Sequence, residues 1–555
     1  MEDNAELVFV PLGGVGEIGM NLALYGFGPA ESRDWIMVDC GVTFPGPDLP
    51  GVDLVLPDIR FVQDLGEALK AIIITHAHED HYGALMALWP MLRTPVWATP
   101  FTSGMLEAKA EFEADAPEIP ISVYKEGDKF TIGPFEITAV NVTHSIPEPV
   151  SLAIRTPAGM VIHTGDWKID PGPSLGRNTD ADAFTKLGEE GVLALICDST
   201  NAMREGTSPT ENEVSASLEK LIEEAPGRVA VTTFSSNVGR IRSVARAAQQ
   251  AGRKVLLMGQ SIRRVADVAE GLGYLEGIAE FIEEDEFESV DRRELVIILT
   301  GSQGESRAAL AKLSRDEHPR VHLSAGDTVI YSSRTIPGNE KPIIDTMNRL
   351  TDMGVSIITA DDTLVHVSGH PRKKELEQMY QWTRPQVVVP VHGEAMHLNA
   401  HAGLAARAGV PQVAPVRNGD LLRLAPGSAE VVAHVPFGRI FKDGKLIGDE
   451  EEIGVKQRRK LAFAGLVACS VVIDRHGRLA DEVDISSYGL PENLSDGESF
   501  EDLLYDAACG AVDSIPPGRR KDPDLVASAV EKAIRAEARN QWGKKPVVTV
   551  FVAKV

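Results

Sequence analysis

His76-Ala77-His78-Glu79-Asp80-His81 places four possible metal ligands within one short stretch. The motif directly follows an apolar run at 71–75, a pattern typical of a buried strand that ends in a loop. In an extended loop His76 and His78 point to the same side, and Asp80 and His81 then turn toward a second position. Imidazole and carboxylate are the ligands of hydrolytic zinc sites. Because the chain has only 14 histidines, three in this stretch indicate a site for two metal ions rather than chance.

Length and composition exclude several classes of protein. A chain of 555 residues is too long for one hydrophobic core and predicts about two to four domains. No apolar run approaches the ~20 residues of a membrane span, and the acidic N-terminus is unlike a signal peptide. We therefore expect a cytoplasmic protein without membrane attachment. The 4 cysteines form no CxxC pair, which argues against a disulfide framework or thiolate zinc site and leaves His and carboxylate ligands.

The net charge of −26 argues against indiscriminate binding to phosphate groups. A local basic channel can still bind a nucleic acid inside an acidic envelope. The candidate basic stretches are residues 240–242, 263–264, 372–374, 456–460 and 519–521. By charge pattern alone, each stretch is as readily a solvated helix face or a linker.

The order of apolar runs predicts a layered α/β protein in several parts. In the first part, short β-branched runs end at polar residues or glycine, as buried strands that lead into loops do. The middle part alternates helix (211–224, 240–250) and strand (228–233, 254–258) patterns, which predicts an inserted parallel-sheet domain. The last part predicts the order strand, strand, helix, helix, strand. The expected boundaries are 1–207 and 364–442 for the two halves of the first domain, 208–363 for the insertion, 443–460 for a linker and 461–555 for a small C-terminal α/β domain.

The histidine motif and four other positions resemble the metallo-β-lactamase superfamily. The motif has the form HxHxDH, and each other position follows a predicted strand. These positions are Asp39 in Val38-Asp39-Cys40-Gly41, His144 in Thr143-His144-Ser145, Asp166 in Thr164-Gly165-Asp166 and His392 in Val391-His392-Gly393. Each position alone is a weak signal, but their order together with the motif is specific. The resemblance implies an αββα sandwich for the first domain.

This resemblance implies two Zn2+ ions in each subunit, with Mn2+ or Mg2+ as alternatives for activity. One ion would be held by His76, His78, His144 and Asp166, and the other by Asp80, His81, Asp166 and His392. Two cations that share a carboxylate lower the pKa of a water molecule and clamp phosphate oxygens, which suits the hydrolysis of a phosphodiester. Asp80 is thus also expected to be catalytic, and Asp39 is expected to orient a ligand histidine.

The insertion resembles that of the β-CASP nucleases and, among them, that of the ribonuclease J family. Three additional β-CASP positions match Asp198, His370 and His392, and a histidine at the third position favours RNA over DNA. The stretches similar to ribonuclease J are 11–21, 232–237, 300–305, 336–340 and the C-terminal domain, so the resemblance covers nearly the whole chain. The glycine-rich run 13–19 is interpreted as a tight turn near the metal site rather than as a dinucleotide-binding loop.

The resemblance implies two further groups of functional residues. Asp198 and His370 would form an acid pair that protonates the leaving 3′-oxygen, because a histidine held by a carboxylate carries a proton near neutral pH. The alternative is that Asp198 only orients His370. A pocket for a 5′-monophosphate would use hydroxyls, amides and a histidine in turns beside glycine. Its expected residues are Ser235, Ser236, Asn237, His366, Val367, Ser368, Gly369 and His370.

Together these features imply a 5′-to-3′ exoribonuclease that acts on 5′-monophosphorylated RNA and also cuts internally, in RNA maturation and decay. The expected substrate is single-stranded RNA. The expected assembly is a homodimer or homotetramer built through the C-terminal domain, with an RNA helicase or other RNA-degradation factors as partners. The alternatives are a β-CASP endonuclease without 5′-end dependence, a non-catalytic RNA-binding subunit of a degradation complex, and a hydrolase of a small ester or lactam. The insertion argues against the last, because a small substrate needs no such lid.

Overall fold

The computed structural model describes residues 5–113, 115–495 and 497–555. The chain forms two compact units, one made of Met1–Thr43 with Leu56–Arg439 and the other of Phe44–Val55 with Ile440–Val555. No helix of the described residues is long and apolar enough to cross a bilayer.

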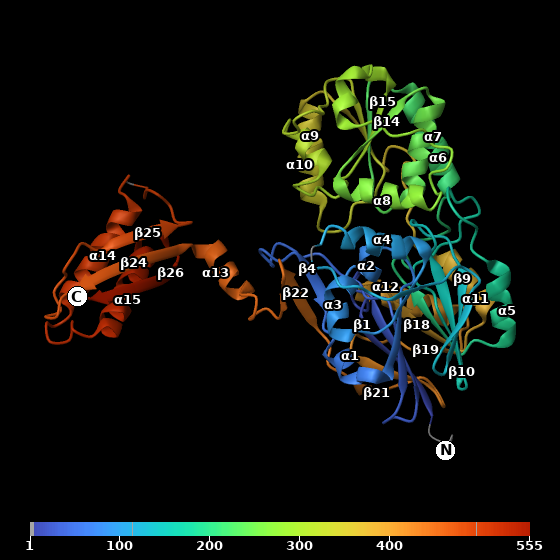
Figure 1. Cartoon of the computed structure of the whole chain (residues 1–555), viewed down its shortest axis with the longest axis horizontal. Helices are drawn as coiled ribbons and strands as arrows, with labels where there is room; N and C mark the ends of the chain where they lie inside the picture. Colours follow the sequence, from blue (N-terminus) through green and yellow to red (C-terminus); the bar gives the residue numbers. More distant parts are fainter. Residues whose placement is uncertain (1–4, 114, 496) are drawn as a thin grey trace. The chain divides into compact units, whose positions relative to one another are not determined.

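Two large sheets form the base of the first unit (Figure 1). The eight-stranded sheet has the order β21-β20-β1-β2-β3-β5-β6-β7, and the seven-stranded sheet has the order β19-β18-β12-β11-β10-β9-β8. The strands of the first sheet are β1 (Glu6–Gly13), β2 (Leu22–Gly28), β3 (Asp34–Val38), β5 (Leu69–Ile73), β6 (Val96–Ala98), β7 (Ile121–Val123), β20 (Asp420–Ala425) and β21 (Glu430–His434). Those of the second are β8 (Lys129–Ile132), β9 (Phe135–Asn141), β10 (Val150–Thr156), β11 (Gly159–His163), β12 (Ala194–Asp198), β18 (Val387–Val391) and β19 (Gln412–Val413).

The core between these sheets consists of inward-facing apolar side chains. Phe9 and Ile36 of the first sheet share one fully buried cluster with Leu152 and Val389 of the second. Each such side chain contributes about 1.5–3 kcal/mol when it is removed from water. The outer face of the seven-stranded sheet is covered by α5 (Ala181–Glu190), α11 (Lys373–Thr383) and α12 (Ala395–Arg407). Helices α1 (Arg60–Leu65) and α3 (Leu85–Leu92) lie beside the other sheet, which completes the predicted αββα sandwich (Figure 1).

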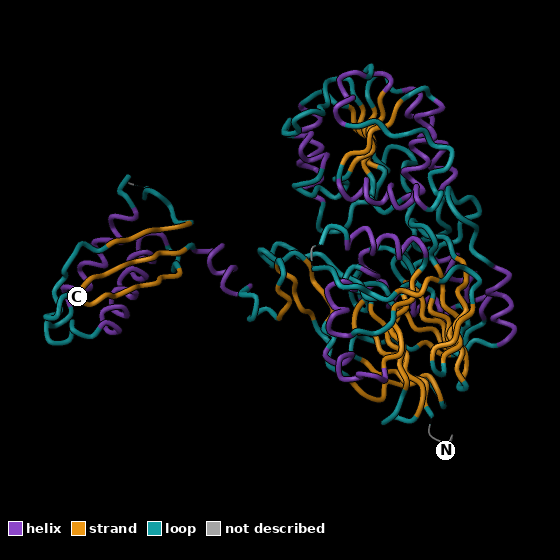
Figure 2. Tube along the Cα trace, viewed as in Figure 1, coloured by secondary structure: helices purple, strands orange, loops and turns teal. Residues whose placement is uncertain are grey.

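A second α/β domain is inserted into the sequence between β12 and β18. Its sheet has the order β14-β15-β13-β16-β17 with all strands parallel, and Figure 2 shows the strands at the centre of the surrounding helices. All residues of β15 are buried, as expected for a parallel strand that is covered on both faces. The strands are β13 (Val229–Thr232), β14 (Lys254–Met258), β15 (Leu295–Leu299), β16 (Thr328–Tyr331) and β17 (Ser356–Ile358), and the helices are α6 (Glu211–Glu224), α7 (Val238–Gln250), α8 (Gln260–Gly271), α9 (Ala309–Ser314) and α10 (Glu340–Asp352). The predicted parallel-sheet insertion is thereby confirmed.

The C-terminal residues have the predicted element order. The elements are β24 (Leu466–Ile473), β25 (Asp484–Tyr488), α14 (Phe500–Ser514), α15 (Pro523–Trp542) and β26 (Val547–Lys554), and the sheet order is β25-β24-β26. In α15 the buried residues Val526, Val530, Ile534 and Ala538 recur every four positions, so one face of the helix packs on the core. The segment 443–460, expected as a linker, contains β23 (Leu446–Gly448) and the start of α13 (Val455–Ala464); β23, β22 (Arg439–Asp443) and β4 (Leu54–Pro57) form a further sheet.

A buried ion cluster joins the insertion to the sandwich. The Arg240 guanidinium of α7 is fully buried and lies 2.7 Å from Glu211 Oε2 at the start of α6. Lys168 Nζ, which is also buried, lies 2.8 Å from Asp170 Oδ2 and 3.8 Å from Glu211 Oε1. Glu211 therefore stands between two buried cations. Removal of its charge leaves the buried Arg240 without its carboxylate partner and Lys168 with Asp170 alone.

We expect Glu211→Gln to destabilise the protein by about 3–5 kcal/mol at neutral pH, the usual cost of breaking a buried ion pair. Burial raises the pKa of Glu211, but the charges of Arg240 and Lys168 lower it by a larger amount. The pKa of Glu211 therefore lies below its usual value. A lowered folded-state pKa means that the stabilisation is present above the unfolded pKa of about 4.3 and is lost as pH falls through the folded value. Urea unfolding at a series of pH values should therefore show the largest difference near neutrality and little difference in acid.

The exposed Glu219 on the same helix provides the control. Glu219→Gln should change the free energy of unfolding by no more than about 0.5 kcal/mol at any pH. A Glu211→Gln variant that is as stable as this control at neutral pH would show that the buried cations need no carboxylate.

Candidate active site

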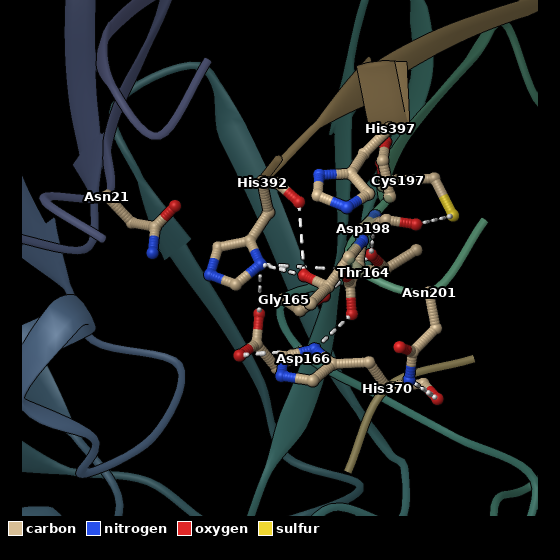
Figure 3. Close-up of polar contacts among 12 residues, drawn as sticks. Asn21, Thr164, Gly165, Asp166, Cys197, Asp198, Asn201, His370, His392 and His397 are labelled. Atoms are coloured by element: carbon tan, nitrogen blue, oxygen red, sulfur yellow. Dashed lines mark hydrogen bonds and ion pairs between the residues drawn. The ribbon is translucent and has the colours of Figure 1, made fainter. Parts of the chain in front are cut away.

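The polar positions predicted from the sequence follow strands of both sheets at one edge of the sandwich. Asp39 follows β3, His76 follows β5 and His144 follows β9, while Asp166, Asp198 and His392 lie at or just after the ends of β11, β12 and β18. Strands β11, β12 and β18 are parallel, and Asp198 is in register with Val391, so Asp198 and His392 emerge side by side. The topology thus gathers residues that are far apart in the sequence (Figure 3).

Asp39 organises the histidine loop. It is buried, with a positive φ of 64°, and accepts hydrogen bonds from the Thr75 amide at 2.8 Å and the Thr75 hydroxyl at 3.0 Å. His81 Nδ1 lies 2.7 Å from Asp39 Oδ2 and donates to it, so His81 Nε2 is the nitrogen that faces the site. His76 Nδ1 lies 3.0 Å from the Thr75 hydroxyl, so its Nε2 is likewise left free. The loop is therefore held with two imidazole lone pairs turned inward.

The first group of ligand atoms converges on His78. Its Nδ1 lies 3.1 Å from His76 Nε2 and 3.0 Å from His144 Nε2. One ring nitrogen carries at most one proton, so it cannot satisfy both neighbours by hydrogen bonding. A tetrahedral metal site with bonds of about 2.0–2.1 Å has about 3.3 Å between neighbouring ligand atoms, close to these spacings. Asp166 Oδ2, at 3.6 Å from His144 Nε2 and 3.9 Å from His76 Nε2, completes the group.

The second group lies on the other side of Asp166. His81 Nε2 is 3.3 Å from Asp166 Oδ1 and 3.7 Å from Asp80 Oδ2, and His392 Nε2 is 3.2 Å from Asp80 Oδ2. Asp80, His81, Asp166 and His392 each offer one ligand atom, all within 4.8 Å of one another. Asp166 therefore belongs to both groups, with one oxygen turned to each. Asp166 Oδ1 is buried and accepts no hydrogen bond from the described residues. Such an oxygen is suited to bind a cation.

The charges around the two groups suit metal cations. Burial lowers the pKa of His76 and His144 well below the usual range and that of His78 to about 4, so these rings are neutral ligands at neutral pH. Burial also acts on His81 and His392, but the carboxylates around them, Asp166 above all, raise the pKa of His81 well above its usual range and that of His392 to about 10. The second group thus lies in surroundings that strongly favour positive charge. The donor set and its charges fit the predicted metal site.

Asp198 and His370 form a pair beside the second group. His370 Nδ1 lies 2.8 Å from Asp198 Oδ2, and the Thr200 amide donates to Asp198 Oδ1 at 2.8 Å. Asp198 is fully buried, whereas the His370 side chain is 19% exposed, so the histidine is the member that a substrate can reach. Burial lowers the pKa of His370, but Asp198 and Asp166 raise it more, so it lies above its usual value. Asp166, Asp198, His370 and His392 also form a third possible metal group, although the Asp198–His370 hydrogen bond already accounts for their spacing.

Gly369 lies directly against a predicted ligand. Its carbonyl accepts a hydrogen bond from His144 Nδ1 at 2.8 Å, which turns His144 Nε2 toward His78. A Cβ at this position would lie 2.5 Å from two ring atoms of His144, whose side chain is buried. The backbone at position 369 lies so close to the His144 ring that only glycine fits there. The loop that follows the insertion is thereby connected to the group of ligand atoms around His78.

We expect Gly369→Ala to lower metal affinity about 10- to 100-fold, the usual effect of disturbing a partner that orients a metal ligand. The affinity is measured by titrating the metal-stripped variant with Zn2+ and following the return of hydrolysis and of thermal stability. Gly271→Ala is the matched control, because an added Cβ there meets nothing within 4 Å. Wild-type affinity in Gly369→Ala would contradict the role of this contact.

The structure brings the two segments of the predicted phosphate pocket together, but several of their side chains are already engaged. The Phe234 ring lies 6.5 Å from that of His366, and Arg240 Nη1 donates to the Val365 carbonyl at 2.8 Å. The Asn237 amide oxygen caps α7, and Ser368 Oγ accepts a hydrogen bond from Asn201. Val367 is buried, so it offers only its backbone. Ser235 and Ser236 are half-buried, and His366 Nδ1 is buried without a partner.

Three residues at the site had no assigned role in the sequence analysis. Asn21 Nδ2 donates to the Asp80 carbonyl at 3.0 Å and lies 3.0 Å from His81 Nε2. The Thr200 hydroxyl lies 2.7 Å from His392 Nδ1, and Thr75 joins Asp39 to His76. Asn21 directly follows the glycine-rich run, whose Gly16 amide donates to the Gly393 carbonyl beside His392. The glycine-rich run 13–19 is therefore a turn at the site, as predicted. Its predicted place near the metal site is the sequence feature that could have pointed to Asn21.

Four family models match the chain. They are the Beta-lactamase superfamily domain at residues 34–185, the Ribonuclease J beta-CASP domain at 226–350, the Zn-dependent metallo-hydrolase RNA specificity domain at 357–415 and the Ribonuclease J C-terminal domain at 453–555. A solved structure of a protein of unknown function from Enterococcus faecalis covers 75% of this chain and 100% of its own, with a TM-score of 0.52 and 17% identity, and so supports the fold alone. Fold, site and models together define a metallo-hydrolase of the metallo-β-lactamase class with a β-CASP insertion.

Similar proteins of known family show to which family within this class the chain belongs. A ribonuclease J of Sinorhizobium meliloti is 62% identical over 555 residues, which is 100% of this chain and 98% of the relative. The ribonuclease J of Thermus thermophilus is 37% identical over 99% of this chain and 95% of its own, and that of Mycolicibacterium smegmatis is 36% identical over 98% and 96%. The chain belongs to the ribonuclease J family.

Proposed function

We propose that this chain is a metal-dependent ribonuclease that removes nucleotides from the 5′ end of 5′-monophosphorylated, single-stranded RNA and also cuts RNA internally. The observation that carries the proposal is the joining of two His/Asp groups by Asp166 next to the Asp198–His370 pair. The names of the relatives and of the RNA specificity domain support RNA as the substrate. A cavity of about 410 Å3 opens beside His144, large enough for part of a nucleotide chain.

We propose that the two groups hold two Zn2+ ions, or Mn2+ in their place. His76, His78, His144 and Asp166 would hold one, and Asp80, His81, Asp166 and His392 the other. Bound there, the cations would stabilise charge on phosphate oxygens and lower the pKa of a water molecule. The chain's own contribution is to fix the ligands, since Asp39, Thr75, Thr200 and the Gly369 carbonyl each hold one imidazole in a defined orientation.

We assign to His370 the role of general acid, which donates a proton to the leaving 3′-oxygen. The oxygen of a water molecule bonds to phosphorus as the bond between phosphorus and the 3′-oxygen breaks. The leaving 3′-oxygen takes a proton from His370, and the products are a 3′-hydroxyl on one side and a 5′-phosphate on the other. Asp198 is fully buried and accepts from His370 Nδ1, so it holds the ring with its exposed side toward the substrate. It also favours the protonated ring.

The 5′-phosphate pocket is assigned to the segments around Ser235 and His366. His366 Nδ1 is buried without a partner, and burial together with the charges of Arg240 and Lys168 lowers the pKa of His366 to about 3. The ring is thus neutral but lies in a positive potential that suits a terminal phosphate. The free hydroxyls of Ser235 and Ser236 add donors.

One digest tests this function. RNAs of one sequence with a 5′-monophosphate, triphosphate or hydroxyl, labelled at the 5′ end, are compared with wild-type protein and with His76→Ala. Release of mononucleotides from the monophosphate RNA only, and none with His76→Ala, is expected. Equal internal cutting of all three RNAs would point instead to an endonuclease without 5′-end dependence, and no cutting at all to a non-catalytic subunit.

We also propose that the C-terminal domain builds a homodimer or homotetramer. Strand β26 is an edge strand of its sheet, and its Phe551 side chain is 63% exposed. Unpaired edges and exposed aromatic side chains favour association with another chain. Sedimentation of the wild type should show the oligomer and that of Phe551→Glu a smaller species; a monomeric wild type would contradict the proposal.

A further inference from the structure

The buried side chain of Asn201 lies next to the Asp198–His370 pair (Figure 3). Its hydrogen bonds join three loops. Asn201 Nδ2 donates to Ser368 Oγ at 2.9 Å and to the His370 carbonyl at 3.1 Å. Asn201 Oδ1 accepts a hydrogen bond from Arg334 Nη1 at 3.1 Å. A guanidinium from the insertion is thus fixed one side chain away from His370.

Two more arginines belong to the same place. The Arg204 amide donates to the Asn201 carbonyl at 2.8 Å within one turn, and Arg372 follows His370 by two positions. The Arg372 Nε is buried and has no hydrogen-bond partner. The pKa of Arg334 is lowered by burial and by the nearby charges of Arg204 and Arg372. We call Arg204, Arg334 and Arg372 the arginine cluster.

The arginine cluster is not paired with carboxylates in the part of the chain that the structure describes. Among the described residues, no carboxylate oxygen lies within 4.0 Å of its guanidinium nitrogens. In each of the other basic stretches at least one arginine is paired: Arg240 with Glu211, Arg263 with Glu283, Arg458 with Asp443 and Arg520 with Asp513. The three neighbouring guanidinium groups without acid partners give a local positive charge in a chain with a net charge of −26. An anion bound among them would offset their mutual repulsion.

We propose that the arginine cluster binds a backbone phosphate of single-stranded RNA next to the phosphodiester that is cleaved. This inference rests on the proposed ribonuclease function. The guanidinium fork matches two phosphate oxygens, and three such groups near one another suit an anion with several acceptor atoms. Arg204 and Arg334 are exposed, so the site is open to a strand that passes by. Asn201 is the positioning residue that ties the site to His370.

The test measures RNA binding apart from cleavage. Arg204→Gln, Arg334→Gln and Arg372→Gln are compared with wild type by fluorescence anisotropy on ice, over a series of salt concentrations. The probes are two single-stranded RNAs of one sequence, one with a 5′-monophosphate and one with a 5′-hydroxyl. Each variant should bind about 10-fold more weakly, as expected for one lost charge-assisted contact. The slope of log affinity against log salt should become about 0.7 less steep for each lost phosphate contact.

Two further variants sharpen the result. Arg334→Lys keeps the charge without the fork, so it should restore the salt slope but not the full affinity. Arg263→Gln on α8 removes the same charge where it is already paired with Glu283, and should leave affinity and slope unchanged. An effect equal for both RNA ends supports a backbone phosphate. An effect confined to the 5′-monophosphate RNA, or wild-type affinity and slope in all three glutamine variants, would overturn the proposal.

The same RNAs, incubated at the assay temperature and run on a gel, separate the two proposals. Wild-type protein that binds RNA with the expected dependence on the arginine cluster but does not cut it refutes the ribonuclease function alone. Protein that cuts RNA but whose glutamine variants bind like wild type refutes the arginine cluster alone.

Discussion

Asp166→Asn is expected to lower RNA hydrolysis by at least about 10³-fold, because metal ions contribute several kcal/mol to the stabilisation of a phosphoryl transition state and each 1.4 kcal/mol is tenfold in rate. Asp166 Oδ2 faces His76 and His144, while Oδ1 faces His81 and His392. An amide offers one oxygen and one NH2 group, so one of the two ligand groups would meet a donor where it needs an acceptor. Since the carboxylate is shared, the other group is weakened as well.

The activity of Asp166→Asn is measured with the 5′-monophosphate RNA, and its metal content by elemental analysis after dialysis. Asp182→Asn on α5 is the control, because Asp182 is exposed and far from the ligand groups in the fold. It should keep wild-type activity and metal. Full metal content and activity in Asp166→Asn would rule out a shared carboxylate.

Asp198→Asn and His370→Asn should each lower the rate of cleavage about 10²- to 10⁴-fold, the usual range for loss of a general acid. In Asp198→Asn the 2.8 Å contact to His370 Nδ1 loses its negative charge, so the ring is less readily protonated. In His370→Asn the proton donor itself is absent. Neither residue belongs to the two proposed ligand groups, so metal content should stay near wild type.

A substrate with sulfur in place of the bridging 3′-oxygen separates acid catalysis from positioning. A thiolate leaves without a proton, so the substrate should restore most of the lost rate to both variants. His78→Asn, which removes a proposed metal ligand, should not be rescued. If the sulfur substrate reacts as slowly as the oxygen substrate in His370→Asn, the pair only positions the RNA.

The positions proposed as metal ligands could be selected from the sequence because zinc chemistry restricts the choice of residue types and the strand ends restrict their places. His76, His78, Asp80 and His81 share one loop, and a strand pattern precedes each of the other positions. The insertion was predictable from the change of period, since α6 and β14 have the expected bounds. In these cases the local sequence pattern and the tertiary structure favour the same secondary structure and the same residue positions.

Other features depend on contacts that no local pattern contains. Lys168 is buried because Asp170 and Glu211 surround it, although lysine alone suggests an exposed residue. The arginine cluster forms because three loops from distant parts of the chain meet at Asn201. In 443–460 the charged residues lie in β23 and the start of α13, where side-chain polarity does not prevent regular structure. Such features follow from topology and could be seen only in three dimensions.

The central claim, that two ligand groups joined by Asp166 hold two cations, is tested most directly by metal stoichiometry. Metal-stripped wild type, His78→Asn and His392→Asn are titrated with Zn2+ in a calorimeter. The account predicts two equivalents for wild type and one for each variant, since each substitution removes a ligand from one group only. A single equivalent in wild type, or two in both variants, would contradict it.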